Sequence, residues 1–258
     1  MSRGLERRLL EFEWGRCVVR RRPPGPGASG ATALFLHALG GSWRWWRFLL
    51  PHLPCDRELL LPDLPGFGAS GGLPAPIPEE ADRVARALDA LGVPAVHVVG
   101  LSMGGAVAAE LAARHADRVR SLALVDAAGW PIPYFPRYLG RIARPWSWCR
   151  PRFLPTLVTD VLRTGPRRLA LGARHVVRYD IRPAAAAARV PALVLWGERD
   201  RLLPPEVGRA LAASLHARFE LVPRAGHIVP GDRPDECARR LAAFWDGVER
   251  GGATARST

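Results

Sequence analysis

The sequence predicts an α/β fold in which helices cover both faces of a mostly parallel sheet. Two observations lead to this prediction. Segments typical of strands and of helices alternate along most of the 258-residue chain. The expected central strands are also continuous apolar runs, such as "ALFLH" at 33–37 and "ALVLWG" at 192–197. Strands that are buried on both faces have this composition, whereas half-exposed strands alternate apolar and polar residues.

The first third of the chain predicts a hairpin, two buried strands and a helix between them. The hairpin spans 9–22 and turns at Trp14 and Gly15. The run 31–39 and the run 57–70, which ends in a Gly/Pro-rich turn, are expected strands. Between them, apolar residues recur at helical spacing: Trp43, Trp46, Leu50 and Leu53.

The following elements alternate more regularly. The segment 79–93 begins with acidic residues and ends at Gly92, as a helix does. The later expected elements are a strand at 95–101, a helix at 103–116, strands at 119–127 and 191–200, a helix at 204–215, a strand at 218–223 and a closing helix at 235–248.

The alternation is interrupted between residues 129 and 189, a segment rich in Pro, Arg and aromatic residues. An irregular insertion of that length between two core strands is uncommon unless it has a function, so we expect a cap, or lid. The core then comprises 1–128 and 190–250, and a disordered tail is expected at 251–258.

The basic composition does not by itself predict a nucleic-acid partner. The formal net charge is +13, but the chain contains no Lys, Asn or Gln, so all 37 basic residues are Arg. These arginines are spread along the whole length, which is typical of a coding bias and a solvated surface rather than of a selected basic patch. We therefore expect no nucleic-acid partner.

Metal sites, disulfides and membrane spans are not expected either. The four cysteines lie far apart without a CxxC pattern. The N-terminus lacks the apolar core of a signal peptide, and the weakly charged stretch 93–113 carries a histidine, a glutamate and three glycines, unlike a membrane span. We expect a cytoplasmic protein with no metal or organic cofactor and no transmembrane segment.

The stretch "GLSMG" at 100–104 matches G-x-S-x-G between an expected strand and an expected helix. In that context Ser102 occupies a sharp, strained turn that exposes its hydroxyl as a nucleophile, and the flanking glycines allow the backbone segments to pass closely. The Met103 N–H at the helix start can hold an oxyanion. A phosphate loop would need a lysine, which the chain lacks.

A serine nucleophile needs a base and an orienting acid. His227 lies after the last expected strand, and Asp200 follows the strand at 191–200, so both are expected at the carboxyl edge of the sheet. The order Ser102, Asp200, His227 is typical of one class of serine hydrolases. Asp126, at the end of "SLALVD", is the alternative acid.

Three further residues are candidates near this nucleophile. A second oxyanion donor is expected from the loop at 34–42, most simply the backbone N–H of Leu39. His37, at the end of its strand, is expected to order this loop and is a candidate substrate contact. Trp45 is expected to point away from the buried face of its helix and to line the pocket.

Taken together, four motifs resemble the α/β-hydrolase fold family, in its serine-nucleophile, esterase- or lipase-like branch with a cap. The motifs are "HALGGS" at 37–42, "DLPGFGAS" at 63–70, "GLSMGG" at 100–105, and "WGERD" with "AGHIVPGDRPDE" near the end. The resemblance implies an eight-stranded sheet, a cap after the sixth strand, the triad Ser102, Asp200 and His227, and oxyanion N–H groups from Leu39 and Met103. Ala38 departs from the glycine that the family usually has there.

The resemblance implies a serine hydrolase that cleaves a carboxylic ester, thioester or lactone of small or medium size, with an apolar acyl part, through an acyl-enzyme. An acyltransferase or a C–C bond hydrolase would use the same triad. Dehalogenases and epoxide hydrolases of this fold have Asp in place of the nucleophilic serine, and Ser102 argues against both.

The expected cap interleaves aromatic residues with arginines, and four interpretations stay open. The cap is an apolar lid over the acyl group with Trp130 at the substrate, an arginine site for a substrate carboxylate or phosphate, a peripheral contact with an anionic membrane, or a simply packed lobe. The aromatic residues of the expected cap are Trp130, Tyr134, Phe135, Tyr138, Trp146, Trp148 and Phe153, and its interleaved arginines are Arg137, Arg141, Arg144, Arg150 and Arg152.

The sequence does not determine the oligomeric state.

Overall fold

The computed structural model describes residues 4–131 and 149–254, with side chains described up to residue 251. Several residues of the expected cap therefore lie outside the described residues: Tyr134, Phe135, Tyr138, Trp146, Trp148, Arg137, Arg141 and Arg144. No helix in the described part of the chain is both long and apolar enough to cross a membrane.

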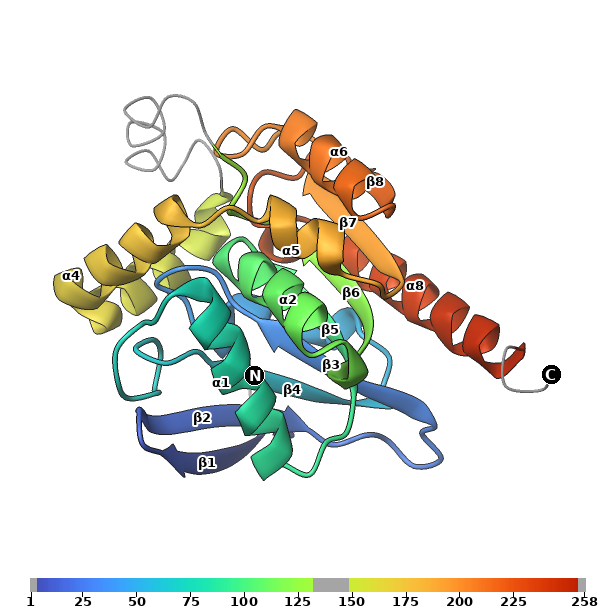
Figure 1. Cartoon of the computed structure of the whole chain (residues 1–258), viewed down its shortest axis with the longest axis horizontal. Coiled ribbons are helices and arrows are strands. Elements are labelled where there is room, and N and C mark those ends of the chain that lie inside the picture. Colours follow the sequence, from blue (N-terminus) through green and yellow to red (C-terminus); the bar gives the residue numbers. More distant parts are fainter. Residues whose placement is uncertain (1–3, 132–148, 255–258) are drawn as a thin grey trace.

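A sheet of eight strands forms the centre of the molecule (Figure 1), as predicted. Its spatial order is β1-β2-β4-β3-β5-β6-β7-β8, with β2 antiparallel to both neighbours and all other pairs parallel. The strands are β1 (Glu6–Phe12), β2 (Gly15–Arg22), β3 (Gly30–Leu36), β4 (Arg57–Asp63), β5 (Val96–Leu101), β6 (Val119–Val125), β7 (Ala192–Gly197) and β8 (Arg218–Val222).

Helices cover both faces of the sheet (Figure 1). One face carries α1 (Ile77–Ala90), α2 (Met103–Arg114), α5 (Arg182–Ala187) and α6 (Pro205–Ser214). The other face carries α8 (Pro234–Thr254) with the short turns η1 (Trp43–Trp46) and η2 (Leu50–His52). The remaining elements are η3 (Ala116–Arg118), η5 (Pro151–Phe153), α4 (Leu154–Arg178) and α7 (Val229–Asp232).

Two hydrophobic clusters, one on each face, explain the continuous apolar strands. In β3, Leu34 and Leu36 enter the cluster beneath α1 and α2, whereas Ala33 and Phe35 enter the opposite one. Phe35 meets Trp46 and Trp245 edge to face, with ring centroids 5.1 and 6.2 Å apart. Successive side chains of a strand point to opposite faces, so a central strand needs apolar residues at every position.

Two element predictions were wrong. Residues 43–53 form the two short 3-10 turns η1 and η2 rather than one helix. Their backbone N–H groups bond to carbonyls three residues back, as from Arg47 to Arg44 and from Leu49 to Trp46, and Pro51 has no N–H to add to the series. At the other end, α8 continues to Thr254, so residues 251–254 of the predicted tail are helical. No proline interrupts this stretch, and the two glycines there weaken a helix without ending it.

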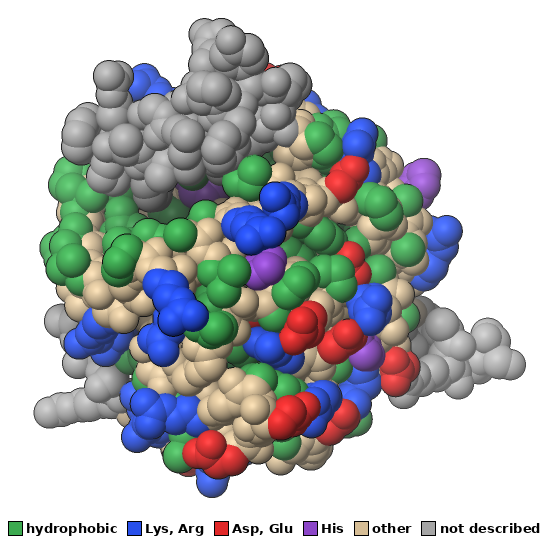
Figure 2. Space-filling view, turned by 60° about the vertical axis from the view of Figure 1, so that its left-hand side comes forward, with side chains coloured by type: hydrophobic (Ala, Val, Ile, Leu, Met, Phe, Trp, Pro, Cys, Tyr) green, Lys and Arg blue, Asp and Glu red, His purple; other side chains and the backbone are tan. Residues whose placement is uncertain are grey.

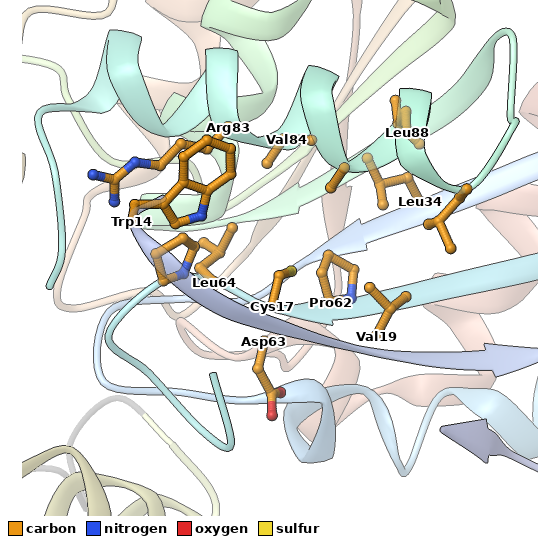
Figure 3. A pocket seen from close by; sticks show the side chains of 13 residues that line it. Trp14, Cys17, Val19, Leu34, Pro62, Asp63, Leu64, Arg83, Val84 and Leu88 are labelled. Carbon is orange, nitrogen blue, oxygen red and sulfur yellow. The ribbon is translucent and has the colours of Figure 1, made fainter. Parts of the chain in front are cut away.

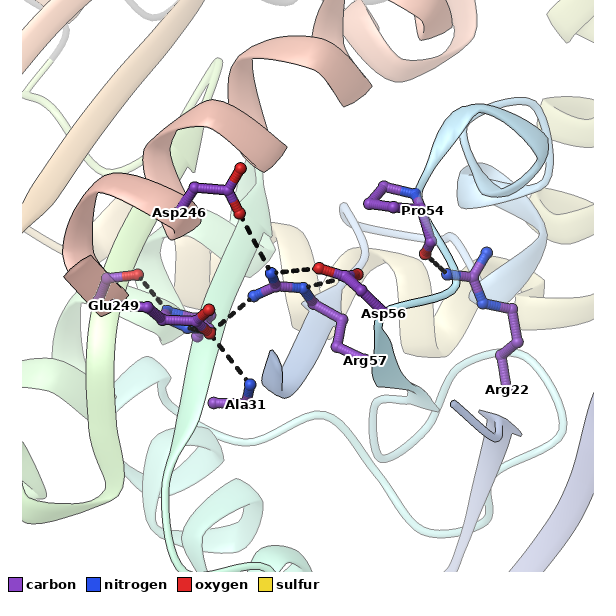
Figure 4. Close-up of polar contacts among 9 residues, drawn as sticks. Arg22, Ala31, Pro54, Asp56, Arg57, Asp246 and Glu249 are labelled. Atoms are coloured by element: carbon purple, nitrogen blue, oxygen red, sulfur yellow. Dashed lines mark hydrogen bonds and ion pairs between the residues drawn. The ribbon is translucent and has the colours of Figure 1, made fainter. Parts of the chain in front are cut away.

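A network of charged side chains ties the end of α8 to the amino edge of the sheet (Figure 4). The Arg57 guanidinium, which is buried, donates to Glu249 at 3.0 Å and to Asp56 at 2.7 Å and lies 4.8 Å from the Trp245 ring. Glu249 also accepts from the Ala31 N–H, and the His97 Nε2 lies 3.0 Å from it. The carboxylate of Glu249 thus joins α8, β3, β4 and β5.

The four cysteines are free thiols. Cys17, Cys149 and Cys237 are buried, and Cys55, in the turn before β4, is exposed. Burial raises the pKa of the Cys17 and Cys149 thiols to about 12, so neither is a ready nucleophile.

Candidate active site

Ser102 occupies the turn between β5 and α2, with φ 51° and ψ −114°. This conformation is rare for a residue with a side chain, and it is held by two backbone hydrogen bonds. The Ser102 N–H donates to the Val125 carbonyl, and the Ala128 N–H donates to the Ser102 carbonyl, each at 3.0 Å. The serine therefore sits at the N-terminus of α2, where the helix leaves backbone N–H groups without helical acceptors.

Close backbone contacts explain the glycines around Ser102. A Cβ placed on Gly100 would lie 2.3 Å from the Gly104 carbonyl oxygen, and one placed on Gly104 would lie 2.1 Å from the Leu36 carbonyl oxygen. Both contacts are with backbone, which cannot move aside. The first turn of α2 consequently lies directly against the end of β3 and the loop that follows it.

The structure brings Ser102, His227 and Asp200 together. The His227 Nε2 lies 3.1 Å from the Ser102 Oγ, and the His227 Nδ1 lies 2.8 Å from the Asp200 Oδ2. The other Asp200 oxygen accepts from the Leu202 and Leu203 N–H groups, each at 2.8 Å. His227 and Asp200 are both buried, and each follows a strand at the carboxyl edge of the sheet.

Asp126, the alternative acid, lies next to Asp200 and His227, but its hydrogen bonds come from backbone N–H groups. Its carboxylate accepts from the Gly197 N–H at 2.8 Å and from the Val229 N–H at 3.4 Å. Burial, and then the charge of Asp200, raise the pKa of Asp126 well above its ordinary value. Carboxyl oxygens of Asp126 and Asp200 and a His227 nitrogen lie within 4.8 Å of one another.

The loop after β3 is ordered by His37. Its Nε2 accepts from the Leu64 N–H at 2.9 Å, and its Nδ1, which therefore carries the proton, donates to the Ala38 carbonyl at 2.8 Å. Burial lowers the pKa of His37 to about 4, so the ring is neutral at physiological pH. Both ring nitrogens bind backbone; a role of His37 in substrate binding stays a prediction.

The expected orientation of Trp45 was wrong. Its side chain is buried and meets Phe153 edge to face, with centroids 5.0 Å apart. A 3-10 turn has three residues per turn, so the face assigned by α-helical spacing is rotated. Trp130 is half-buried against the cluster beneath α2, and the Arg182 guanidinium lies 5.9 Å from its ring. Substrate contact by either tryptophan stays a prediction.

Sequence reasoning missed two buried carboxylates beside the loop after β3. Asp63 accepts from the Trp43 and Ala69 N–H groups at 2.7 and 2.8 Å, and Asp160, from α4, accepts from the Ser42 hydroxyl at 2.6 Å. Asp63 is the first residue of the motif "DLPGFGAS" at 63–70, so the sequence pattern pointed to its position. Asp160 bonds to a residue 118 positions away within an irregular insertion, and no sequence pattern pointed to it.

A crevice beside the N-terminal hairpin is too small for a substrate. It lies between the hairpin strand β2 and α1, and its lining includes Trp14, Cys17 and Val84 (Figure 3). Its free volume is about 20 Å³, room for little more than a water molecule. A space of this size does not admit an acyl group.

A model of the alpha/beta hydrolase family matches residues 33–240 of the chain. The dihydrolipoyllysine-residue acetyltransferase component of the acetoin cleaving system of Pseudomonas putida is 31% identical over 84% of the chain, but the match covers only 64% of that protein. The chain likewise spans 62% of the corresponding Cupriavidus necator protein.

Two other relatives match along nearly their whole length. The pimeloyl-acyl-carrier-protein methyl ester esterase of Neisseria meningitidis serogroup C is 29% identical over 89% of the chain and 98% of the esterase. The solved structure of a thermophilic esterase from Thermogutta terrifontis is 25% identical, with a TM-score of 0.80 over 94% of the chain and 99% of that structure.

Proposed function

Because the chain belongs to the alpha/beta hydrolase family, we propose that Ser102, His227 and Asp200 are the catalytic triad of a serine hydrolase acting on ester-type bonds. The observation that carries this proposal is the unbroken chain of short contacts from the Asp200 carboxylate through His227 to the Ser102 hydroxyl. The three residues lie after the carboxyl ends of β5, β7 and β8. This place is next to the switch point of the sheet, where the strand that follows β3 lies on one side and the strand that follows β5 lies on the other.

In the proposed reaction the Ser102 oxygen attacks the substrate carbonyl carbon while the His227 Nε2 takes the hydroxyl proton. The Asp200 carboxylate holds the Nδ1 proton and stabilises the imidazolium. The Leu39 and Met103 N–H groups hold the oxyanion. His227 then protonates the leaving group, and a water deprotonated by the same histidine cleaves the acyl-enzyme to the acid and free Ser102.

The proposed substrate is a carboxylic ester, thioester or lactone of small or medium size with an apolar acyl part. The names of the two full-length relatives, both esterases, support the ester class. We propose that residues 129–189 form a cap on a core of 1–128 and 190–250. In the described part of this segment, Gly172 of α4 lies against the Leu39 side chain, next to the proposed oxyanion donor.

A fluorophosphonate probe tests the nucleophile. We expect covalent labelling of the intact chain, complete loss of labelling in Ser102→Ala, and unchanged labelling in the control Ser214→Ala, whose hydroxyl bonds to the Ala210 carbonyl in α6. Hydrolysis of p-nitrophenyl esters of graded acyl length then reports the depth of the acyl pocket. Folded protein that neither reacts with the probe nor hydrolyses any ester would contradict the proposal.

Hydrolysis is distinguished from its alternatives by product analysis. An acyltransferase with the same triad would form a new ester or amide when alcohols or amines are added, whereas the proposed hydrolase releases the same amount of free acid with or without them. A C–C bond hydrolase would cleave a vinylogous 1,5-diketone faster than any ester. Either of these two outcomes would replace the proposed reaction.

We also propose a peripheral contact between α4 and an anionic lipid surface. Val158 and Leu162 are 53% and 75% exposed on this helix, although both are large apolar residues. The one acidic residue of α4, Asp160, is buried. The same helix carries four exposed arginines: Arg163, Arg167, Arg174 and Arg178. This side of the molecule faces the viewer in Figure 2, where apolar and arginine side chains lie beside one another.

Vesicle flotation tests this contact. We expect binding to vesicles that contain phosphatidylserine, weaker binding at high salt, and a clear loss in Leu162→Asp. Leu9→Asp is the control, because Leu9 is likewise an exposed leucine, at 51%, but lies on β1 in the hairpin. Equal binding of the two variants would contradict a contact through α4.

A further inference from the structure

A buried carboxylate from α4 reaches the loop that carries the proposed oxyanion donor. The Asp160 side chain has no exposed surface, and its Oδ2 accepts from the Ser42 hydroxyl at 2.6 Å. Its other oxygen lies 3.4 Å from the Arg44 guanidinium, which is one-third exposed. A separation of 2.6 Å is at the short end of the range for hydrogen bonds between oxygen atoms.

Ser42 transmits this contact to the backbone of the loop. Its Oγ accepts from the Arg44 N–H at 3.3 Å and so caps η1. One turn along α4, the Thr164 Oγ lies 3.3 Å from the Gly40 carbonyl and 2.9 Å from the Asp160 carbonyl, and it shares its single proton between them. Polar groups of α4 therefore contact the loop at Gly40 and at Ser42.

Apolar packing brings the second half of α4 against the same loop. A Cβ on Gly172 would lie 2.7 Å from the Leu39 Cδ1, and a Cβ on Gly40 would lie 3.0 Å from the Leu169 Cδ1. Gly40 also has φ +70°, a conformation that other residues rarely adopt. The loop is thus held between α4 on one side and, on the other, the first turn of α2 at Gly104.

Stability alone does not explain an acid at this position. Burying a carboxylate costs free energy that its partners must compensate, and an apolar residue of similar volume often stabilises a protein equally well or better. The neighbouring contacts of α4 with the loop, through Leu169 and Gly172, are apolar. What the carboxylate adds is a directed bond that fixes the position of one hydroxyl group.

We propose that Asp160 is a positioning residue for the oxyanion loop: through Ser42 it fixes the backbone that presents the Leu39 N–H to the developing negative charge. This inference rests on the proposed function. Loss of the bond leaves the substrate's ground-state contacts in place but displaces a donor that acts in the transition state. Removing Asp160 should consequently lower kcat and leave KM nearly unchanged.

The test compares Asp160→Ala, Asp160→Asn, Ser42→Ala and the double variant Asp160→Ala/Ser42→Ala, with Thr159→Ala as a control. The Thr159 hydroxyl bonds only to its own helix, at the Pro155 carbonyl, among the described contacts. We expect Asp160→Ala to lower kcat about 10- to 100-fold with KM within about twofold. Asp160→Asn keeps an acceptor for Ser42 and should recover part of this loss.

The double variant decides whether the two residues act together. If Asp160 acts through Ser42, the double variant loses less activity than the product of the two single losses, because the bond between Asp160 and Ser42 is broken only once. Any loss beyond that of Asp160→Ala then reflects the bond from the Arg44 N–H to Ser42. Independent, multiplicative losses, or unchanged kcat in folded Asp160→Ala, would overturn the inference. Should Asp160→Ala not fold, Asp160→Asn and Ser42→Ala carry the same comparison.

The unmodified protein separates this inference from the proposed function. If it reacts with the fluorophosphonate and hydrolyses esters while the variants keep full kcat, the positioning role alone is wrong. If the unmodified protein does neither, both the proposed function and the role of Asp160 are overturned.

Discussion

At the scale of single residues, the environment separates two carboxylates that lie side by side. Asp200 accepts two backbone N–H groups and faces the His227 ring, whereas Asp126 bonds only to backbone and has its pKa raised by burial and by the charge of Asp200. Two adjacent buried acids do not ionise equally easily. The contact with His227 therefore belongs to Asp200, while burial and the neighbouring carboxylate disfavour ionisation of Asp126.

Replacing each acid by its amide should therefore have very different effects. Asp200→Asn is expected to lower kcat by about 10³- to 10⁴-fold, because the amide favours the wrong imidazole tautomer. Asp126→Asn leaves the contact between Asp200 and His227 in place and should stay within about tenfold of the parent. Steady-state kinetics on a p-nitrophenyl ester measures both variants; a larger loss in Asp126→Asn would make Asp126 the orienting acid.

The sequence supplied most of this site but not all of it. Ser102, Asp200 and His227 could be found because each follows a strand, and the ends of parallel strands meet at one edge. Trp45 could not be oriented, because spacing cannot distinguish a 3-10 turn from an α-helix. Asp160 could not be found at all, since its partner Ser42 lies 118 residues away and the intervening insertion has no regular pattern.

At the scale of elements, α1 contains a buried acid that makes its stability depend on pH. Glu80 accepts from the Ala75 N–H at 2.7 Å, its second oxygen has no partner among the described residues, and burial raises its pKa to about 8. The unfolded chain loses this proton near pH 4.5. The contribution of protonated Glu80 to the unfolding free energy is therefore fully present below pH 4.5 and is lost as the pH rises toward 8.

Glu80→Gln removes this pH dependence while keeping an acceptor for Ala75. Between pH 5 and 8 the parent should lose on the order of 1 to 3 kcal/mol of unfolding free energy relative to the variant. Urea unfolding at a series of pH values measures the difference. Parallel stability curves for the two proteins would show that Glu80 ionises normally.

The turn into α2 imposes a different requirement, close backbone approach. Gly104→Ala should destabilise the protein by more than about 3 kcal/mol, because its Cβ would meet the Leu36 carbonyl at 2.1 Å. Gly247→Ala is the control: Gly247 lies in α8 with no atom near the added Cβ, and the change should stabilise by about 0.5 to 1 kcal/mol. Thermal unfolding of both variants should show a lower Tm for Gly104→Ala and a higher Tm for Gly247→Ala. A similar change of Tm in the two variants would argue against the close contact between Gly104 and the Leu36 carbonyl.

Sequence patterns identified these elements well where one physical rule dominated. Strands with continuous apolar residues and helices with a clear stop, such as α1 before Gly92, lie within a few residues of their expected bounds. The end of α8 was missed because the sequence of its last residues, "RGGAT" at 250–254, contains no apolar residues at helical spacing. The kink of α4 at Gly165 and Pro166 lies inside the insertion, where no periodicity was evident.

At the scale of the whole molecule, the two edges of the sheet have different tasks. The carboxyl edge carries Ser102, Asp200 and His227, whereas the amino edge carries the network of Arg57, Glu249 and His97. Strands of this length separate the two by roughly 20 Å, so changes at one edge should leave the other undisturbed.

Glu249→Ala tests this separation. It leaves the buried Arg57 guanidinium without its closest partner on α8 and should cost about 2 to 4 kcal/mol of unfolding free energy, with kcat unchanged. Asp246→Ala removes a longer contact of 3.6 Å at a half-exposed residue and should cost less than about 1 kcal/mol. Denaturant unfolding and ester hydrolysis measure the two effects; a fall in kcat in folded Glu249→Ala would contradict the independence of the edges.

The distribution of the cysteines has a practical consequence for attaching the enzyme to a surface. Cys55 is exposed in the turn that leads into the amino end of β4, and the other three thiols are buried. A maleimide should therefore react at one place, at the end of the sheet remote from Ser102. Coupling through this thiol would anchor every molecule in the same orientation, with the proposed nucleophile Ser102 directed away from the support.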